Sequence, residues 1–96
     1  MGRAKGHPMS RRAMPRLRAA FGRRLLELRR ARGLSQDRLG VRTGLSGKFL
    51  GEVERGEKSI SLDNLARVAR AVGVSLEAMV EGLEARKGIK RRDWGV

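Results

Sequence analysis

The feature that most constrains the fold of this chain is a repeated pairing of a glycine with a serine a few residues later. Each glycine ends an apolar stretch, and each serine stands directly before the next one. The glycines are Gly33, Gly44, Gly56 and Gly73, and the serines are Ser35, Ser46, Ser61 and Ser75. Glycine commonly ends a helix, and serine commonly caps the start of one. The pattern therefore predicts short helices joined by tight connections.

Apolar residues recur at helical spacing between these breaks. Phe21, Leu25 and Leu28 stand at positions i, i+4 and i+7, which places them on one face of a helix. No segment carries a strand signal. The predicted helices are residues 16–32, 36–43 and 47–54, a fourth whose apolar stripe runs from Leu62 to Val72, and a fifth after Ser75 whose apolar residues are Leu76, Met79, Val80 and Leu83. The expected fold is an all-α domain of five short helices.

The composition limits the classes of protein that this domain can belong to. The chain has 96 residues, of which 40% are hydrophobic and only three are aromatic, so we expect one domain with a core of Leu, Val and Ala. It has no cysteine, which excludes disulfides and thiolate metal sites. No apolar run approaches the roughly 20 residues of a membrane span. We expect a cytoplasmic, nucleoid-associated protein without a membrane partner.

The net charge of +13 is concentrated at the two ends of the chain. Residues 1–24 contain eight basic and no acidic residues, residues 25–85 contain ten basic and nine acidic, and residues 86–96 contain five basic and one acidic. A nearly neutral body with basic ends is typical of a module that binds a polyanion such as nucleic acid. Solubility alone is the other interpretation, and 23 basic residues exceed what solubility requires.

The charge distribution divides the chain into three parts. We predict a basic N-terminal arm over residues 1–15, a folded domain over 16–84 and a basic C-terminal tail over 85–96. The arm has too few apolar residues to order itself in isolation. Such an arm can follow the backbone of a DNA duplex or enter its minor groove. Its predicted DNA contacts are Arg3, Lys5, Arg11 and Arg12.

The second and third predicted helices are joined by only about three residues around Gly44. Helices joined this closely must cross steeply. They share Leu39, Leu45, Leu50 and Val53 as a common apolar seam. This arrangement is a helix-turn-helix.

Short motifs around this helix pair resemble those of a known family. They are Leu34-Ser35-Gln36 at the start of the second helix, Gly44 in the turn, Glu54-Arg55-Gly56 at the end of the third, Ser61-Leu62, and Gly73-Val74-Ser75-Leu76. Over residues 21–82 the chain resembles the DNA-binding domain of Cro and lambda-type repressors, the Xre-like family. The resemblance implies that the third helix lies in the major groove and that the second spans the neighbouring backbone.

The resemblance also implies roles for individual residues. Gly47, Lys48 and Glu52 fall at positions where the family reads bases. Lys48 can donate to a guanine edge, and Glu52 can accept from a cytosine amine. The alternatives are that Lys48 contacts a phosphate and that Glu52 pairs with a neighbouring cation. The predicted contacts to the DNA backbone are Gln36, Ser46, Arg55 and Lys58.

Glu54 has a structural role in the resemblance. It falls where the family makes an ion pair with the first-helix position that Arg29 occupies here. A guanidinium can hold both oxygens of a carboxylate, so the pair would attach the third helix to the first.

Glycines inside these short helices require a reason, because each costs roughly 0.8–1 kcal/mol of helix stability relative to alanine. We expect that Gly47 and Gly51 let the backbone of the third helix approach the DNA groove closely. Gly40 stands where the family commonly has alanine, which lowers the helix propensity of the second helix.

An enzyme is not expected. The only histidine, His7, has no fixed carboxylate or nucleophile beside it, and one histidine without cysteine cannot hold a structural zinc ion. We expect no cofactor and no metal. The favoured function is a transcriptional repressor that binds operator DNA as a homodimer, with Met79 or Leu83 on the dimer surface. The alternative is an interaction protein on the same scaffold: an antitoxin with a toxin partner, or a bridging cofactor of the transcription machinery.

Overall fold

The computed structural model describes residues 14–84. Over this range the chain forms five helices and no strand, which confirms the all-α fold class. The helices are α2 (Pro15–Ala31), α3 (Gln36–Thr43), α4 (Gly47–Glu54), α5 (Leu62–Val72) and α6 (Leu76–Val80). The bounds of α3 and α4 are those predicted, and α2 begins and ends one residue earlier than predicted. Two sets of predicted residues lie outside the described range. They are the arm contacts Arg3, Lys5, Arg11 and Arg12, and the tail over residues 85–96.

Serine side chains cap the start of four helices. In each cap the hydroxyl oxygen accepts a hydrogen bond of 2.9–3.1 Å from the backbone N–H three residues later. The capping residues are Ser35, Ser46, Ser61 and Ser75. Gly44 and Gly73 follow α3 and α5 in the left-handed conformation, each with φ of 77°, which residues with a side chain rarely adopt. The glycine and serine pattern therefore sets the helix boundaries.

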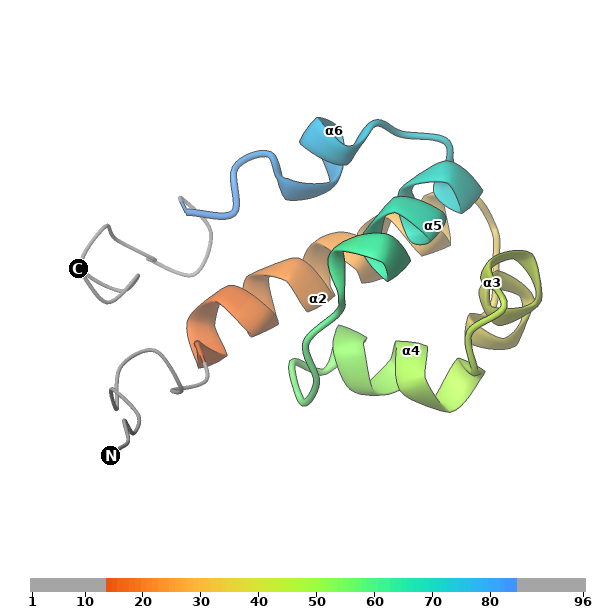
Figure 1. Ribbon diagram of the computed structural model, residues 1–96, viewed down its shortest axis with the longest axis horizontal. Helices are drawn as coiled ribbons and strands as arrows, with labels where there is room; N and C mark the ends of the chain where they lie inside the picture. The colour runs from red at the N-terminus through yellow and green to blue at the C-terminus, as the bar shows by residue number, and fades with distance from the viewer. Residues whose placement is uncertain (1–13, 85–96) are drawn as a thin grey trace, which may run out of the picture.

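α2 and α5 lie in the middle of the molecule, with α4 on one side of them and α6 on the other (Figure 1). α4 packs on α2 and α3, whereas α6 packs on α2 and α5. α3 contacts both α4 and α5. The helix pair α3–α4 is thus separated from α6 by the central helices.

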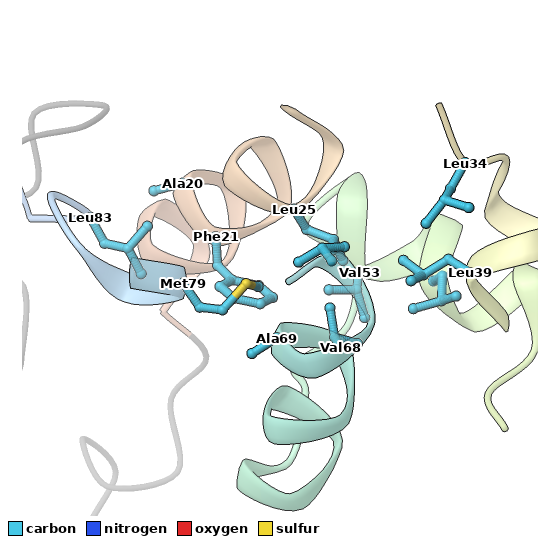
Figure 2. Packing of buried hydrophobic residues seen from close by; sticks show 12 residues of the cluster. Ala20, Phe21, Leu25, Leu34, Leu39, Val53, Val68, Ala69, Met79 and Leu83 are labelled. Atoms are coloured by element: carbon cyan, nitrogen blue, oxygen red, sulfur yellow. The ribbon is translucent and has the colours of Figure 1, made fainter. Parts of the chain in front are cut away.

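One apolar cluster holds these helices together (Figure 2). Every helix contributes at least one side chain that is fully buried. These side chains are Leu25 from α2, Leu39 from α3, Leu50 and Val53 from α4, Val68 and Val72 from α5, and Met79 from α6. The core therefore consists mainly of Leu and Val, and it includes three residues of the predicted seam between α3 and α4.

Two expectations about which apolar side chains are buried and which are exposed were wrong. Met79 and Leu83, expected on a dimer surface, are only 0% and 7% exposed. α6 ends at Val80, and the turn that follows brings Leu83 back onto the core cluster. Leu62, expected in the apolar stripe of α5, is 71% exposed. It is the first residue of α5 and lies one turn before Leu65, which packs against the cluster.

No helix formed by residues 14–84 combines the length and the apolar character that crossing a bilayer requires.

Candidate nucleic-acid interface

α3 and α4 form a helix-turn-helix unit whose turn satisfies its own backbone groups. The N–H of Gly44 donates to the carbonyl of Gly40 over 2.8 Å, and the N–H of Leu45 donates to the same carbonyl over 3.2 Å. The hydroxyl of Thr43 donates to the carbonyl of Leu39 over 2.9 Å and accepts from the N–H of Leu45 over 3.3 Å. These bonds fix the direction in which α4 leaves α3.

Packing within this unit explains why position 40 is a glycine. A methyl group on Gly40 would collide with the carbonyl oxygen of Leu45 and would lie 3.3 Å from the backbone nitrogen of Gly47. These atoms belong to the backbone of the turn and of the start of α4, and they cannot rotate away. The alanine that the family commonly has at this position therefore does not fit here, because the turn lies directly against α3.

A buried network attaches the end of α4 to α2. Nε of Arg29 donates to Oε2 of Glu54 over 2.6 Å, and Nη2 donates to Oε1 over 2.9 Å, so the guanidinium holds both carboxylate oxygens. Nη1 of Arg29 donates to the carbonyl of Leu34 over 2.8 Å. The hydrogen bond to Glu54 raises the pKa of Arg29, although burial opposes this. The structure thus brings together the two residues that the resemblance pairs.

Gln36 belongs to the same network. Its Nε2 donates to Oε1 of Glu54 over 2.9 Å, so it links the first residue of α3 to the last residue of α4. Sequence reasoning missed this bond, because it depends on the angle at which α3 and α4 cross. Gln36 was expected at a DNA phosphate, and that role stays a prediction beside the structural one.

Contacts within the domain explain why positions 47 and 51 of α4 are glycines. A methyl group on Gly47 would run into the carboxylate of Asp37. A methyl group on Gly51 would lie 3.1–3.3 Å from the guanidinium of Arg55 and the amide of Gln36. Both glycines therefore make room for polar side chains of the same unit. Their predicted role in close approach to DNA is a separate matter and stays a prediction.

Lys48 and Glu52 lie four residues apart on α4 and so share one of its faces. Lys48 is exposed and Glu52 is partly exposed. Within residues 14–84, neither side chain forms a hydrogen bond or an ion pair. Glu52 therefore forms no ion pair in this part of the chain, although its charge attracts the nearby guanidinium of Arg55, and the alternative in which it pairs with a neighbouring cation stays open. Both side chains are available to an external partner.

The predicted backbone contacts after α4 differ in how available they are. Nε of Arg55 donates to Oε2 of Glu57 over 2.8 Å. This hydrogen bond raises the pKa of Arg55 and lowers the pKa of Glu57, and both side chains are more than half exposed. Lys58 is exposed and forms no ion pair within the described range. Lys58 can therefore meet a phosphate as it stands, whereas Arg55 must first leave Glu57.

Ser46 and Arg38 lie at the two helix starts of this unit. The oxygen of Ser46 accepts from the N–H of Phe49 as the cap of α4, and its hydroxyl hydrogen remains available to a phosphate oxygen. Arg38 stands exposed in the first turn of α3, and in the described part of the chain its side chain has no ion pair. Sequence reasoning missed Arg38 as a candidate phosphate contact, although its place after a helix cap was the available signal.

Other arginines bind the domain itself rather than presenting their charge to a partner. Three arginines in α2 and directly after it donate to backbone carbonyls of distant segments. They are Arg18 to Glu57 over 3.0 Å, Arg24 to Ala78 over 2.7 Å and Arg32 to Val72 over 2.7 Å. Part of the positive charge that the sequence assigns to a polyanion partner is therefore used to hold the fold together.

The described residues give no sign of a metal centre. Among residues 14–84, no group of three or more His, Cys, Asp or Glu side chains is placed to hold a metal ion.

Comparisons with known proteins agree with this geometry. Residues 20–83 match the model of a family described as a helix-turn-helix domain. The chain belongs to this family. Control protein C.BamHI of Bacillus amyloliquefaciens is 27% identical to it over 66 residues, which are 68% of this chain and 82% of that protein. The uncharacterized HTH-type transcriptional regulator y4dJ of Sinorhizobium fredii is 36% identical over 59 residues, 62% of this chain and 77% of that protein.

Solved structures extend the comparison to the fold. The restriction-modification controller protein C.AhdI from Aeromonas hydrophila has 40% identity and a TM-score of 0.63, over 65% of this chain and 94% of that one. The clp gene regulator ClgR from Corynebacterium glutamicum has 30% identity and a TM-score of 0.70, over 77% and 96%. The resemblance to Xre-like regulators is confirmed. The family is one of DNA-binding transcriptional regulators and not of enzymes.

Proposed function

We propose that this helix-turn-helix regulator represses transcription by occupying an operator as a symmetric dimer, at the nucleoid in the cytoplasm. α4 enters the major groove, and α3 spans the neighbouring backbone. The observation that carries the proposal is the way α4 is held. The three-residue turn fixes its start, and the Arg29–Glu54 pair attaches its end to α2. A helix fixed at both ends presents its outer residues to DNA with little freedom.

Base reading is assigned to the outer face of α4. Lys48 donates to guanine O6 and N7, and Glu52 accepts from the N4 amine of cytosine. The support is that both side chains stand on one face and that neither forms a hydrogen bond or an ion pair in the described part of the chain. Gly47, beside them, contributes its backbone and no side chain, so few base pairs are read directly.

Contacts to phosphates surround this face. Lys58 supplies a charge directly after α4, and Arg55 supplies another once it has left Glu57. Gln36, Ser46 and Arg38 contribute from the starts of α3 and α4. The arm residues Arg3, Lys5, Arg11 and Arg12 add charge that acts on all DNA sequences alike.

The dimer forms along the exposed edge of α6. Leu76 and Val80 are 42% and 43% exposed there, and they replace Met79 and Leu83, which are buried. A symmetric dimer of this family binds half-sites about one helical turn apart, roughly 34–36 Å. Sedimentation on a selected operator tests this. A complex with a single copy of the chain would contradict the dimer.

Selection of binding sites from random duplexes tests the function as a whole. We expect enrichment of one palindromic site. Lys48→Ala should then weaken binding to that site by about 1–3 kcal/mol and relax the preference at one or two base pairs. Lys58→Ala is the matched control, because loss of a phosphate contact weakens binding to all sequences alike.

Two outcomes would count against this function. If Lys48→Ala and Lys58→Ala gave the same uniform loss, Lys48 would be a phosphate contact and not a base reader. If no duplex were enriched, sequence-specific repression would be wrong, and the antitoxin or bridging role would take its place.

A further inference from the structure

A groove of about 460 Å³ lies between α3 and α5, which pack on each other (Figure 1). The last turn of α3 contributes two of its lining residues, and α5 contributes four at helical spacing, which share one face. The lining residues are Arg42, Thr43, Asp63, Ala66, Arg67 and Arg70. The proposed DNA contacts come from α4, the loop after it and the first turn of α3, and none of these segments lines the groove.

The charges that line this groove are not compensated. Arg42, Arg67 and Arg70 are all exposed. Within residues 14–84, the side chains of Arg42 and Arg70 form no hydrogen bond and no ion pair, and Arg67 donates only to the neutral Oδ1 of Asn64 over 2.7 Å. Asp63 forms no ion pair in this range either, although it stands four residues before Arg67. Three cations against one acid indicate an anionic partner.

Exposed apolar side chains adjoin the same groove. Ala66, which lines it, is exposed, and Leu62, one turn earlier on α5, is 71% exposed. Val41, directly before Arg42 on α3, is 85% exposed. The proposed dimer edge uses neither Leu62 nor Val41. Apolar side chains beside uncompensated cations favour a protein partner, because a partner made only of charged groups would leave them in water.

We propose that this groove binds an acidic segment of a partner protein. Carboxylates of the segment pair with Arg42, Arg67 and Arg70, since a guanidinium can hold both oxygens of a carboxylate. An apolar side chain of the segment covers Leu62. A second copy of this chain does not fit, because its net charge is +13. A DNA backbone would bring phosphates against Asp63 and leave Leu62 uncovered.

The position of the groove lets the chain hold a protein and DNA at the same time, a step that rests on the proposed function. The groove and the proposed DNA contacts share no side chain. Each partner should therefore bind with the same affinity whether or not the other is present. The helix-turn-helix unit would then carry two separate binding surfaces.

Calorimetric titration of the full chain with a synthetic acidic peptide tests the groove without DNA. The peptide consists of glutamates with a leucine at every fourth position. Salt of about 0.15 M screens attraction between exposed charges that lie farther apart than about 8 Å. We expect saturable binding. A peptide with glutamine in place of glutamate should bind at least tenfold more weakly, and one with serine in place of leucine should also bind more weakly.

A pair of double variants tests whether the groove itself is the site. Arg67→Gln/Arg70→Gln should weaken binding of the acidic peptide at least tenfold. Arg23→Gln/Arg30→Gln is the matched control, because it removes two exposed charges from α2 and leaves the groove unchanged. It should bind the peptide as the parent does. Equal losses in the two double variants would mean attraction by net charge alone and would overturn the proposal.

Other outcomes with the unmodified chain would also overturn it. They are no saturable binding of the acidic peptide, equal binding of the glutamine peptide, or equal binding of the serine peptide. Amide chemical shifts of the parent chain decide the matter even if a variant fails to fold. Shifts at the end of α3 and along α5 are expected on addition of the acidic peptide, and shifts confined to residues 1–13 and 85–96 would contradict the groove.

Operator binding separates this groove from the proposed function. Arg67→Gln/Arg70→Gln should bind duplexes as tightly as Arg23→Gln/Arg30→Gln does. A larger loss with a shallower salt dependence would make the groove a phosphate contact and would overturn the proposal. A chain that binds its operator but not the acidic peptide retains the proposed function and loses the groove. A chain that binds the peptide in the groove but no operator retains the groove and loses the proposed function.

Discussion

The α4 side and the α6 side of the molecule are packed on the central helices by different means. On the α4 side the contact is close and polar. A methyl group on Gly22 of α2 would collide with the carbonyl oxygens of Val53 and Glu54, so the two helix backbones touch. The buried Arg29–Glu54 pair then fixes the end of α4. α4 cannot shift along α2 without losing these contacts.

On the α6 side the contact is mainly apolar, and one arginine binds the backbone of the helix. Met79 is fully buried beneath α6, and Arg24 donates to the carbonyl of Ala78 over 2.7 Å. A hollow of about 600 Å³ lies beside the end of this helix. The comparison teaches that α4 is fixed by contacts with precise geometry, whereas α6 is held mainly by apolar packing beside this hollow.

The largest effect is expected from breaking the buried pair. Arg29→Met leaves the Glu54 carboxylate without its main partner, in a side chain that is only 4% exposed. We expect a loss of about 3–5 kcal/mol in the free energy of unfolding, measured by urea denaturation. Arg23→Met is the matched control, because the Arg23–Glu27 pair in the same helix is exposed and 3.8 Å long. It should change stability by less than about 0.5 kcal/mol.

Equal losses in the two variants would remove the distinction between the buried and the exposed pair. The double variant Arg29→Met/Glu54→Leu sharpens the test. It removes the stranded carboxylate, so it should recover part of the stability lost in Arg29→Met. No recovery would mean that Arg29 acts through its bond to the Leu34 carbonyl rather than through Glu54.

A smaller effect is expected at the backbone contact between α2 and α4. Gly22→Ala places a methyl group against two carbonyl oxygens, so the helices must move apart, and we expect a loss of about 1–3 kcal/mol. Val80→Ala on the α6 side should cost less than about 1 kcal/mol, because Val80 is 43% exposed beside the hollow. If Val80→Ala cost as much as Gly22→Ala in urea denaturation, the α6 side would be as tightly packed as the α4 side.

The same contrast explains what could be predicted from the sequence. Helix boundaries depend on local chemistry, so Ser46 and Gly44 could be assigned to a cap and a turn before any contact was known. The pairing of Arg29 with Glu54 came from a family resemblance and could not be derived from spacing. The bond from Gln36 to Glu54 depends on the crossing of α3 and α4, and a sequence carries no direct signal for that angle.

The hydrophobic pattern also could not predict which residues are buried where the chain turns or where two helices touch. Leu83 was expected in the fifth helix and partly exposed on a dimer surface, whereas α6 ends at Val80 and Leu83 is only 7% exposed. The sequence analysis assigned no role to Gly22, because a close backbone approach leaves no mark in the hydrophobic pattern. Both residues are determined by how elements pack, which local propensity does not encode.

A still smaller effect is expected at Gly47. From the sequence, Gly47→Ala should gain helix propensity and keep or raise stability. The structure adds an opposing cost, since the new methyl group displaces the Asp37 carboxylate from the start of α3. These contributions are each about 1 kcal/mol or less, so we expect stability within about 1 kcal/mol of the parent.

A double-mutant cycle with Asp37→Ala separates the two contributions at Gly47. Without the Asp37 carboxylate, Gly47→Ala should be stabilising. An effect of Gly47→Ala that does not depend on residue 37 would show that the contact between Asp37 and Gly47 has no energetic weight. Operator binding by Gly47→Ala then tests the DNA role alone: affinity equal to that of the parent would exclude close approach of the backbone at this position.

The smallest effect is expected from the exposed pair Arg55–Glu57. The hydrogen bond from Arg55 holds the pKa of Glu57 below the value of about 4.3 that a glutamate has in an unfolded chain. A carboxyl with a lowered pKa in the folded state contributes stability above its unfolded pKa and loses it as pH falls through its folded pKa. Stability measured between about pH 5 and about pH 3 should therefore fall less steeply in Glu57→Gln than in the parent.

This pair also connects the pH test to DNA binding. Glu57 competes with phosphate for Arg55, so Glu57→Gln should bind all duplexes somewhat more tightly, with a steeper dependence on salt. The preference between operators should not change, because no base contact is altered. A variant with unchanged pH dependence and unchanged affinity would mean that the pair is broken in solution. Arg55 would then be as available to DNA as Lys58, and the difference between these two predicted phosphate contacts would disappear.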